Sequence, residues 1–437
     1  MIKKLICAAY FVAAAAIANA QNVNQLINKA DVSRIIQKLS ADDMEGRGSF
    51  TAGIEKAATF IAKEFKAAGL KPLPAEANFR QSFHVIQSTP LSTRVTINGS
   101  AINPDNAIAF AGDSFTWDNT AGVEIVTVKP GDNFRKIFGD YYRSNKKALL
   151  MVDTSFADVF KRIKQHFSHG SVSFDNPGAK QVVMVLGKFQ DVTRYTVRYE
   201  AKVENKPLFN VAGMIKGKTR PQEFVIFSGH YDHLGIVKGK DILAGDSIAN
   251  GADDDASGTT AVIALAKYYK KLNNNARTLI FVAFTAEEIG GFGSQYFSKK
   301  VDPDKTVAMF NIEMIGKPSK FGKNSAFITG YDRSNFGAIL QKNLKGTAFK
   351  FHPDPYPEQN LFYRSDNATL ARLGVPAHTI STDEIDIDKY YHTVNDEFAT
   401  LNVDNIVATI RAIALSSKSI VAAKDSPTRI PKLLDDK

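Results

Sequence analysis

From Asn210 to the C-terminus, short apolar runs alternate with segments whose apolar residues recur at helical spacing. The short runs predict buried strands, and the longer segments predict helices. Strands that alternate with helices are typical of layered α/β domains. The predicted strands span residues 223–228, 277–284, 307–312, 326–329 and 377–380, and the predicted helices span residues 256–272, 292–300, 335–344, 367–373 and 403–421.

Two further regions precede this one. Residues 31–70 predict two helices, the first capped by Asp31 and the second ended by Gly69. Between residues 88 and 206, short β-branched runs are separated by glycine, asparagine, aspartate and proline, which is typical of strands and turns. We therefore divide the chain into a signal peptide (1–20), an N-terminal part of the main domain (21–87), a β-rich insertion (88–206) and the main part of the α/β domain (207–437).

The first 20 residues have the features of an export signal. Lys3 and Lys4 precede an apolar run from Leu5 to Ala18, and small residues frame a cleavage point near Ala20. The run is shorter than the roughly 20 residues that a transmembrane helix needs, and no later apolar run is long enough to span a bilayer. We therefore expect an exported protein, periplasmic or extracellular after cleavage, without stable membrane insertion.

The only cysteine among the 437 residues is Cys7. It lies inside the predicted signal peptide, so the mature chain would contain no cysteine. This excludes a disulfide scaffold, a thiol nucleophile and a zinc or iron–sulfur site with cysteine ligands. Any catalysis must therefore use oxygen and nitrogen groups.

The formal charge of +10 comes from 55 basic and 45 acidic residues. The basic residues are dispersed along the chain, whereas nucleic-acid-binding proteins concentrate them in a patch or run. The charge therefore predicts a solvated basic surface and no nucleic-acid partner.

Histidines and carboxylates collect where the predicted strands end. Strand 223–228 leads into His230 and Asp232, strand 277–284 into Glu287 and Glu288, and strand 307–312 into Glu313. Open α/β sheets bind their ligands at the carboxyl ends of the strands. Two further polar groups are the three aspartates at 253–255, which precede a predicted helix, and His392 near the C-terminus.

These carboxylates have two readings. The three aspartates could cap a helix, and the two glutamates could begin a solvated one. However, a glutamate pair directly after the apolar run 279–284 would be costly in a crevice without a positive charge, and no lysine or arginine is nearby in the sequence. A divalent cation would supply that charge, and imidazole with carboxylate suits zinc, with Co²⁺ or Mn²⁺ as possible substitutes. Because successive side chains at a strand end point in opposite directions, one of Glu287 and Glu288 would bind metal and the other would act as a general base.

Five ordered segments resemble the motifs of peptidase family M28, the co-catalytic zinc aminopeptidases. They are GHYDHLG (229–235), GADDDASG (251–258), AEE (286–288), NIEMIG (311–316) and YHTVND (391–396). DDMEGRGSFTAG (42–53) and KEFKAAGLKP (63–72) also resemble the opening of exported bacterial members. The resemblance covers most of the chain except the insertion, which is only faintly similar to the protease-associated domains that some members carry. The resemblance implies a three-layer α/β/α sandwich with a mixed, mostly parallel central sheet.

The resemblance also implies a ligand set for two zinc ions per chain. His230 and Glu313 would bind one ion, while Glu288 and His392 would bind the other. Asp254 would bridge both ions. Most members have aspartate where this chain has Glu313, which is one methylene longer and still a good oxygen ligand.

Other roles follow from the same resemblance. Glu287 would be the general base, and Asp232 would hold the far nitrogen of His230. Tyr391 matches a tyrosine that contacts the reaction intermediate in the related carboxypeptidase branch, although it could instead be an ordinary packed aromatic residue. The peptide between Asp254 and Asp255 is cis in family members.

Three features lie outside this pattern. Asn367 stands where the family segment usually has histidine. His233 follows His230 by three residues, and the family pattern does not use it as a ligand. The remaining histidines lack paired carboxylates at metal spacing and are interpreted as surface or core residues: His84, His166, His169, His352 and His378.

We therefore expect an exported zinc-dependent aminopeptidase, a metallopeptidase that hydrolyses N-terminal residues from peptides with a free N-terminus. One alternative is a single-zinc glutaminyl cyclase on the same fold, although such cyclases place tryptophan beside the active site and the only tryptophan here, Trp117, falls in the insertion. A glutamate-releasing carboxypeptidase would need an arginine cluster, which the sequence does not show. A receptor-like binding protein without catalysis is disfavoured because every ligand position and the base are occupied by competent residues.

Overall fold

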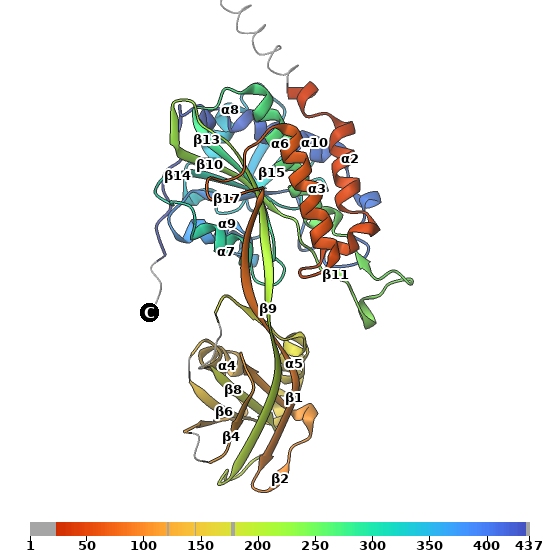
Figure 1. The fold of residues 1–437 in the computed structure, drawn as a ribbon, viewed down its shortest axis with the longest axis vertical. Helices are drawn as coiled ribbons and strands as arrows, with labels where there is room; N and C mark the ends of the chain where they lie inside the picture. The colour runs from red at the N-terminus through yellow and green to blue at the C-terminus, as the bar shows by residue number, and fades with distance from the viewer. Residues whose placement is uncertain (1–22, 120–121, 145, 176–179, 434–437) are drawn as a thin grey trace, which may run out of the picture. The chain divides into compact units, whose positions relative to one another are not determined.

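The computed structural model describes residues 23–119, 122–144, 146–175 and 180–433, so the predicted signal peptide lies outside the described residues. The chain divides into two compact units (Figure 1). The first unit combines the described residues up to Phe83 with those from Leu208 onward, and the second spans His84–Pro207. Among the described residues, every helix is too short or too polar to span a bilayer.

A mixed sheet forms the centre of the first unit. Its strands are β9 (Tyr195–Ile215), β10 (Arg220–His230), β13 (Arg277–Phe284), β14 (Thr306–Ile312), β15 (Ser325–Ile328), β16 (Lys350–Pro353) and β17 (Ala377–Ser381). Their spatial order is β16-β15-β17-β14-β10-β13-β9. β10 pairs in parallel with β13 and β14, as do β14 with β17 and β15 with β16, whereas β13–β9 and β15–β17 are antiparallel. The mixed, mostly parallel sheet is therefore confirmed.

Helices cover both faces of this sheet (Figure 1). They are α2 (Lys29–Leu39), α3 (Ala52–Ala68), α6 (Gly258–Leu272), α7 (Phe292–Ser298), α8 (Phe336–Asn343), α9 (Asn367–Arg372), α10 (Val403–Ser416) and α11 (Lys418–Val421). Val225 and Phe227 of β10 pack into one apolar core with α2, α3, α6, α8 and α10, whereas Ile226 packs into a second core with α7 and α9. Because successive residues of a strand face opposite ways, the two cores lie on opposite faces, and the predicted three-layer sandwich is confirmed.

The first helix begins earlier than the sequence predicts. Asn28 is its N-cap, and the Asn28 side chain accepts a 2.9 Å hydrogen bond from the Asp31 backbone N–H. Asp31 lies in the first turn and forms ion pairs with Arg34 and Lys267, both at 2.8 Å. The prediction of Asp31 as the cap was therefore wrong, because asparagine three residues earlier makes the same capping bond. The predicted end of α3 at Gly69 is confirmed, since Gly69 adopts φ +80.

The described residues of the second unit form a four-stranded sheet with the order β3-β8-β6-β5 and two α-helices. Its elements are β1 (Arg80–Ile97) and β9, both shared with the first unit, and β2 (Ser100–Ala101), β3 (Ala107–Ala111), β4 (Phe115–Trp117), β5 (Glu124–Val128), α4 (Phe134–Arg143), β6 (Lys147–Val152), α5 (Ala157–His166), β7 (Ser171–Ser173) and β8 (Gln181–Leu186). Phe134 of α4 and Phe160 of α5 pack against the four-stranded sheet. The sequence reading missed both helices, although Phe134, Ile137, Phe138 and Tyr141 recur at helical spacing.

His378 of β17 makes the first unit sensitive to acid. Its buried ring donates from Nδ1 to the Thr329 carbonyl at 2.9 Å, and Nε2 lies 2.8 Å from the Ser334 hydroxyl. Burial lowers the pKa of His378 to about 4, below the usual value of 6.5. Because the unfolded chain binds this proton more readily, stability that is present above pH 6.5 is lost as the pH falls toward 4, by about 3 kcal/mol.

Urea unfolding at several values between pH 7.5 and pH 4.5 tests this expectation. His378→Gln removes the titrating group, so the variant's free energy of unfolding should fall less steeply over this range than that of the wild type. Equal slopes for the two proteins would contradict the expectation, whatever their stabilities at pH 7.5.

Candidate metal centre

The residues predicted at the strand ends lie at one edge of the central sheet. His230 is the last residue of β10, Glu287 and Glu288 follow β13, and Glu313 follows β14. Because β13 and β14 both run parallel to β10, their register brings the three carboxyl ends to the same edge. One imidazole and three carboxylates therefore meet there from three separate segments.

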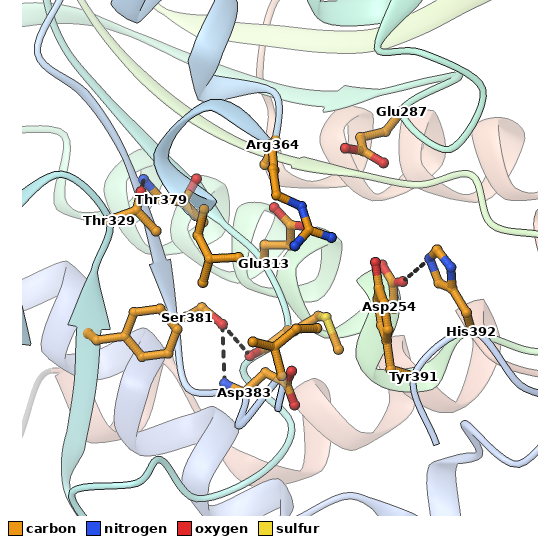
Figure 2. Close-up of a pocket in the computed structure, with 15 residues that line it drawn as sticks. Asp254, Glu287, Glu313, Thr329, Arg364, Thr379, Ser381, Asp383, Tyr391 and His392 are labelled. Atoms are coloured by element: carbon orange, nitrogen blue, oxygen red, sulfur yellow. Dashed lines mark hydrogen bonds and ion pairs between the residues drawn. The ribbon is translucent and has the colours of Figure 1, made fainter. Parts of the chain in front are cut away.

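Asp254 lies between two groups of potential ligand atoms. Its Oδ1 lies 3.1 Å from His230 Nε2, and Glu313 completes this first group, with ligand atoms within 4.8 Å of one another. Its Oδ2 lies 3.2 Å from His392 Nε2, the contact drawn in Figure 2. Glu288 completes the second group, since its Oε2 lies 3.1 Å from the same His392 nitrogen. The fold thus assembles all five residues that the family resemblance names as ligands.

The donor set fits zinc. Two donor atoms about 2.0–2.2 Å from a tetrahedral ion lie about 3.3–3.6 Å apart, close to the 3.1 and 3.2 Å separations from Asp254 to the two histidines. His230 Nε2 is fully buried and, although it is near Asp254, makes no hydrogen bond of acceptable geometry. A buried ring nitrogen without a hydrogen-bond partner, surrounded by carboxylates, is a suitable metal ligand.

Electrostatics in the site also favour a cation. Burial raises the pKa of Glu287 well above its usual range, and the charge of Glu313 adds to the shift. Burial would lower the pKa of His392, but hydrogen bonds to Asp254 and Glu288 outweigh this and raise it to about 10. Without a metal, the site therefore holds protons tightly to compensate for its carboxylates, and a divalent ion would replace them.

Asp232, in the loop after β10, is fully buried. Its carboxylate accepts hydrogen bonds from the backbone N–H groups of Glu287, at 3.1 Å, and Glu288, at 3.3 Å. The carboxylate lies 3.8 Å from His230 Nδ1, beyond hydrogen-bond distance, whereas the backbone carbonyl of Asp232 lies 3.2 Å from that nitrogen. Asp232 therefore joins the loop after β10 to the loop after β13, and its carbonyl faces the histidine ring.

The three adjacent aspartates have different surroundings. Asp255 accepts backbone N–H bonds from His230, Gly258 and Met314, so it connects three segments. Asp253 accepts from the Gly316 N–H at 2.6 Å. Only Asp254 faces both ligand groups, and the peptide between Asp254 and Asp255 is cis, as the family resemblance implies.

His233 also lies at the centre, where the sequence reading assigned it no role. Its Nδ1 lies 2.7 Å from Glu288 Oε1 and 3.7 Å from Asp254 Oδ2, and its side chain is fully buried. His233, Asp254 and Glu288 together form a second set of atoms that could hold a metal ion. The signal in the sequence was the spacing of three residues between His230 and His233.

Arg47, in the segment 42–53, forms hydrogen bonds to backbone carbonyls of the segments that carry the ligands. Its buried guanidinium donates to the carbonyls of Tyr231 at 2.8 Å, Asn250 at 2.6 Å and Gly251 at 2.8 Å. These carbonyls belong to the loop after β10 and to the segment that precedes Asp254. The sequence reading assigned Arg47 no role, because its partners lie about 200 positions away along the chain.

A comparison with protein families assigns the site to a known group. Residues 210–416 match the model of peptidase family M28, and this range contains all five candidate ligands. Residues 210–416 belong to peptidase family M28.

Two relatives of this chain are fungal proteins. Leucine aminopeptidase 1 of Penicillium rubens is 30% identical over 215 residues, which cover 46% of this chain and 52% of the relative. Probable leucine aminopeptidase 2 of Trichophyton verrucosum is 26% identical over 292 residues, which cover 61% of this chain and 55% of the relative. This chain thus spans about half the length of either relative.

Solved structures share the fold. An aminopeptidase from Aneurinibacillus sp. strain AM-1 superposes with a TM-score of 0.56 at 18% identity, covering 95% of this chain and 98% of the aminopeptidase. A zinc aminopeptidase from Bacillus subtilis superposes with a TM-score of 0.53 at 16% identity, covering 90% and 95% of the two chains.

A pocket opens beside the metal centre (Figure 2). Asp254, Glu287, Glu313 and His392 line it, which places the candidate ligands and the candidate base at its wall. Its other lining residues are Met314, Phe327, Thr329, Leu361, Arg364, Ser365, Thr379, Ser381, Asp383, Ile385 and Tyr391.

Tyr391 also lines this pocket, and its ring stacks on the ring of His392 with centroids 3.9 Å apart. Burial raises the pKa of Tyr391 above its usual range, so its phenol keeps its proton. Asn367, the departure from the family pattern, lies outside the pocket and donates from Nδ2 to the carbonyls of Phe362, at 2.9 Å, and Ala377, at 3.2 Å. It therefore stabilises the start of α9 and does not replace a ligand.

Proposed function

We propose that this protein is a zinc-dependent aminopeptidase that holds two zinc ions per chain and releases N-terminal residues from peptides. The observation that carries the proposal is Asp254, whose two oxygens lie 3.1 and 3.2 Å from histidines of separate groups. His230, Asp254 and Glu313 would hold one ion, and Asp254, Glu288 and His392 the other. When bound, the ions would polarise the scissile carbonyl and lower the pKa of the attacking water.

Glu287 is the proposed general base. Its carboxylate lines the pocket, and Asp232 holds its backbone N–H at 3.1 Å. The raised pKa of Glu287 suits a group that takes a proton from water and then gives it to the departing amine. Tyr391, a phenol at the same pocket wall, would donate a hydrogen bond to the reacting carbonyl oxygen.

We expect a preference for a free N-terminus. The amine at the end of a peptide would lie against the carboxylates and one of the ions, whereas an internal peptide bond offers no such group. We also propose that residues 1–20 direct the protein to the periplasm or the medium.

Metal removal tests the metal requirement. We expect close to two zinc ions per chain by elemental analysis, loss of aminoacyl-reporter hydrolysis after chelation, and recovery on adding zinc. The metal-free protein should also unfold at a lower temperature, because binding energy contributes to stability. A protein that binds no zinc, or that hydrolyses the reporters equally well after chelation, would contradict the proposal.

A peptide with N-terminal glutamine distinguishes an aminopeptidase from a glutaminyl cyclase. An aminopeptidase releases glutamine as a free amino acid, whereas a cyclase releases ammonia and leaves the peptide length unchanged. The described first unit contains no tryptophan, since Trp117 belongs to the second unit. We therefore expect release of glutamine and no ammonia.

A further inference from the structure

Glu288, a proposed ligand of the second zinc ion, presents its two carboxylate oxygens to different histidines. Its Oε2 lies 3.1 Å from Nε2 of His392, the other proposed ligand of that ion. Its Oε1 lies 2.7 Å from His233 Nδ1, and the His233 side chain is fully buried. Because a carboxylate can bind an ion through one oxygen or through both, the partner of the second oxygen influences how Glu288 binds.

The short contact indicates which atom carries the proton. As a metal ligand, Glu288 is ionised and only accepts hydrogen bonds, so the Nδ1–H of His233 donates to Oε1. With its proton in this bond, Nδ1 has no lone pair for an ion. Oδ2 of Asp254 lies 3.7 Å from the same nitrogen, beyond hydrogen-bond distance. The hydrogen bond of His233 is therefore to Glu288 and not to the bridging aspartate.

Two segments hold His233 in place. Its backbone N–H donates to the Arg47 carbonyl at 3.2 Å, and residues 48 and 233 form an isolated parallel β-bridge. Its ring lies against Gly251, where a Cβ atom would come within 2.5 Å of two ring carbons. Gly251 also adopts φ +56, which favours glycine. These contacts keep the ring beside Glu288.

We propose that His233 is a positioning residue for the second zinc ion, because its Nδ1–H holds Glu288 Oε1 and leaves Oε2 for the ion. The proposal rests on the two-zinc site of the proposed function. Hydrogen bonds to a ligating carboxylate fix its orientation, and loss of such a partner commonly weakens metal binding by about 10- to 100-fold. The first ion should be little affected, since its other ligands, His230 and Glu313, belong to a separate group.

Zinc titration of the metal-free protein by calorimetry tests the proposal without an activity assay. His233→Leu keeps most of the side-chain volume and removes the donor, so the affinity for one of the two ions should fall by about tenfold or more. His233→Asn places an amide N–H the same number of bonds from Cα as Nδ1, so both affinities should stay within about threefold of the wild type. His84→Ala is the control, since it removes an exposed histidine and should change neither affinity.

A double variant tests whether His233 acts through Glu288. Glu288→Gln alone should leave about one ion per chain. Adding His233→Leu should change the affinity for that remaining ion by less than about twofold, because the carboxylate that His233 holds is already absent. If His233 had a general structural role, the remaining ion would bind more weakly in this background as well, and that result would overturn the proposal.

Other results would overturn the proposal or its basis. Wild-type affinity for both ions in His233→Leu would overturn it, and so would equal losses in His233→Leu and His233→Asn, which would make the ring a ligand. A wild-type protein that binds fewer than two zinc ions would instead overturn the two-zinc site itself. If His233→Leu does not fold, His233→Asn decides alone: affinities close to those of the wild type would support the proposal, and an ion bound about tenfold more weakly would overturn it.

Discussion

Glu287→Gln is expected to lower kcat for aminoacyl-reporter hydrolysis by roughly 10²–10⁴-fold while the zinc content stays at the wild-type value. Glutamine has nearly the same size but cannot take a proton from water. The Glu287 carboxylate belongs to neither ligand group, so both groups keep their donors. Steady-state kinetics and elemental analysis on the same preparation measure the two quantities together.

Two variants serve as controls for this prediction. Glu288→Gln, one residue further on, removes a ligand and should lower the zinc content to about one ion per chain. Glu358→Gln makes the same chemical change at an exposed position and should behave as the wild type. Wild-type kcat in Glu287→Gln would rule out Glu287 as the base, and loss of zinc there would instead make it a ligand.

Arg47→Met is expected to lower the free energy of unfolding of the first unit by about 3–5 kcal/mol. The guanidinium also donates to the Leu39 carbonyl at 2.6 Å, so methionine leaves four close carbonyls without a donor. It also removes a positive charge that interacts with Asp254 and Asp255. Because the freed loops carry His230 and Asp254, zinc affinity should fall as well.

Urea unfolding and zinc titration of the apo-protein measure both effects of Arg47→Met. Arg220→Met is the control, since Arg220 is an exposed arginine of the same unit in a surface ion pair with Glu223 and should change stability by less than about 1 kcal/mol. Arg47→Lys keeps the charge without the planar group of donors, so its free energy of unfolding should lie between those of Arg47→Met and Arg220→Met. Equal stability of Arg47→Met and Arg220→Met would show that the hydrogen bonds of Arg47 contribute nothing.

The strands and the strand-end residues could be predicted from sequence because their signals are local. In β13, all eight residues are buried, and the continuous apolar run 279–284 marks most of the strand. Parallel pairing places the residues that follow neighbouring strands at one edge of the sheet, so the sequence alone predicts that His230 and Glu313 lie close together.

The features that could not be predicted from sequence depend on contacts between distant segments, or on a choice between two neighbouring residues that could each cap the same helix. Arg47 contacts carbonyls of residues 231–251, and no pattern around Arg47 indicates those partners. Asp383 appears in sequence as one acid in an acidic run, and only its burial distinguishes it from Asp386. Asn28 and Asp31 are both competent caps, so the choice between them depends on where α2 packs.

The order of the units along the chain has a consequence for synthesis. α2, α3 and Arg47 precede the second unit, whereas every strand of the first unit's sheet from β10 onward follows it. During translation, the apolar faces of α2 and α3 therefore emerge at least 124 residues before the strands and helices that cover them, because residues 84–207 are made in between. The second unit can complete its own core in that interval, while the metal centre closes only after His392 has left the ribosome.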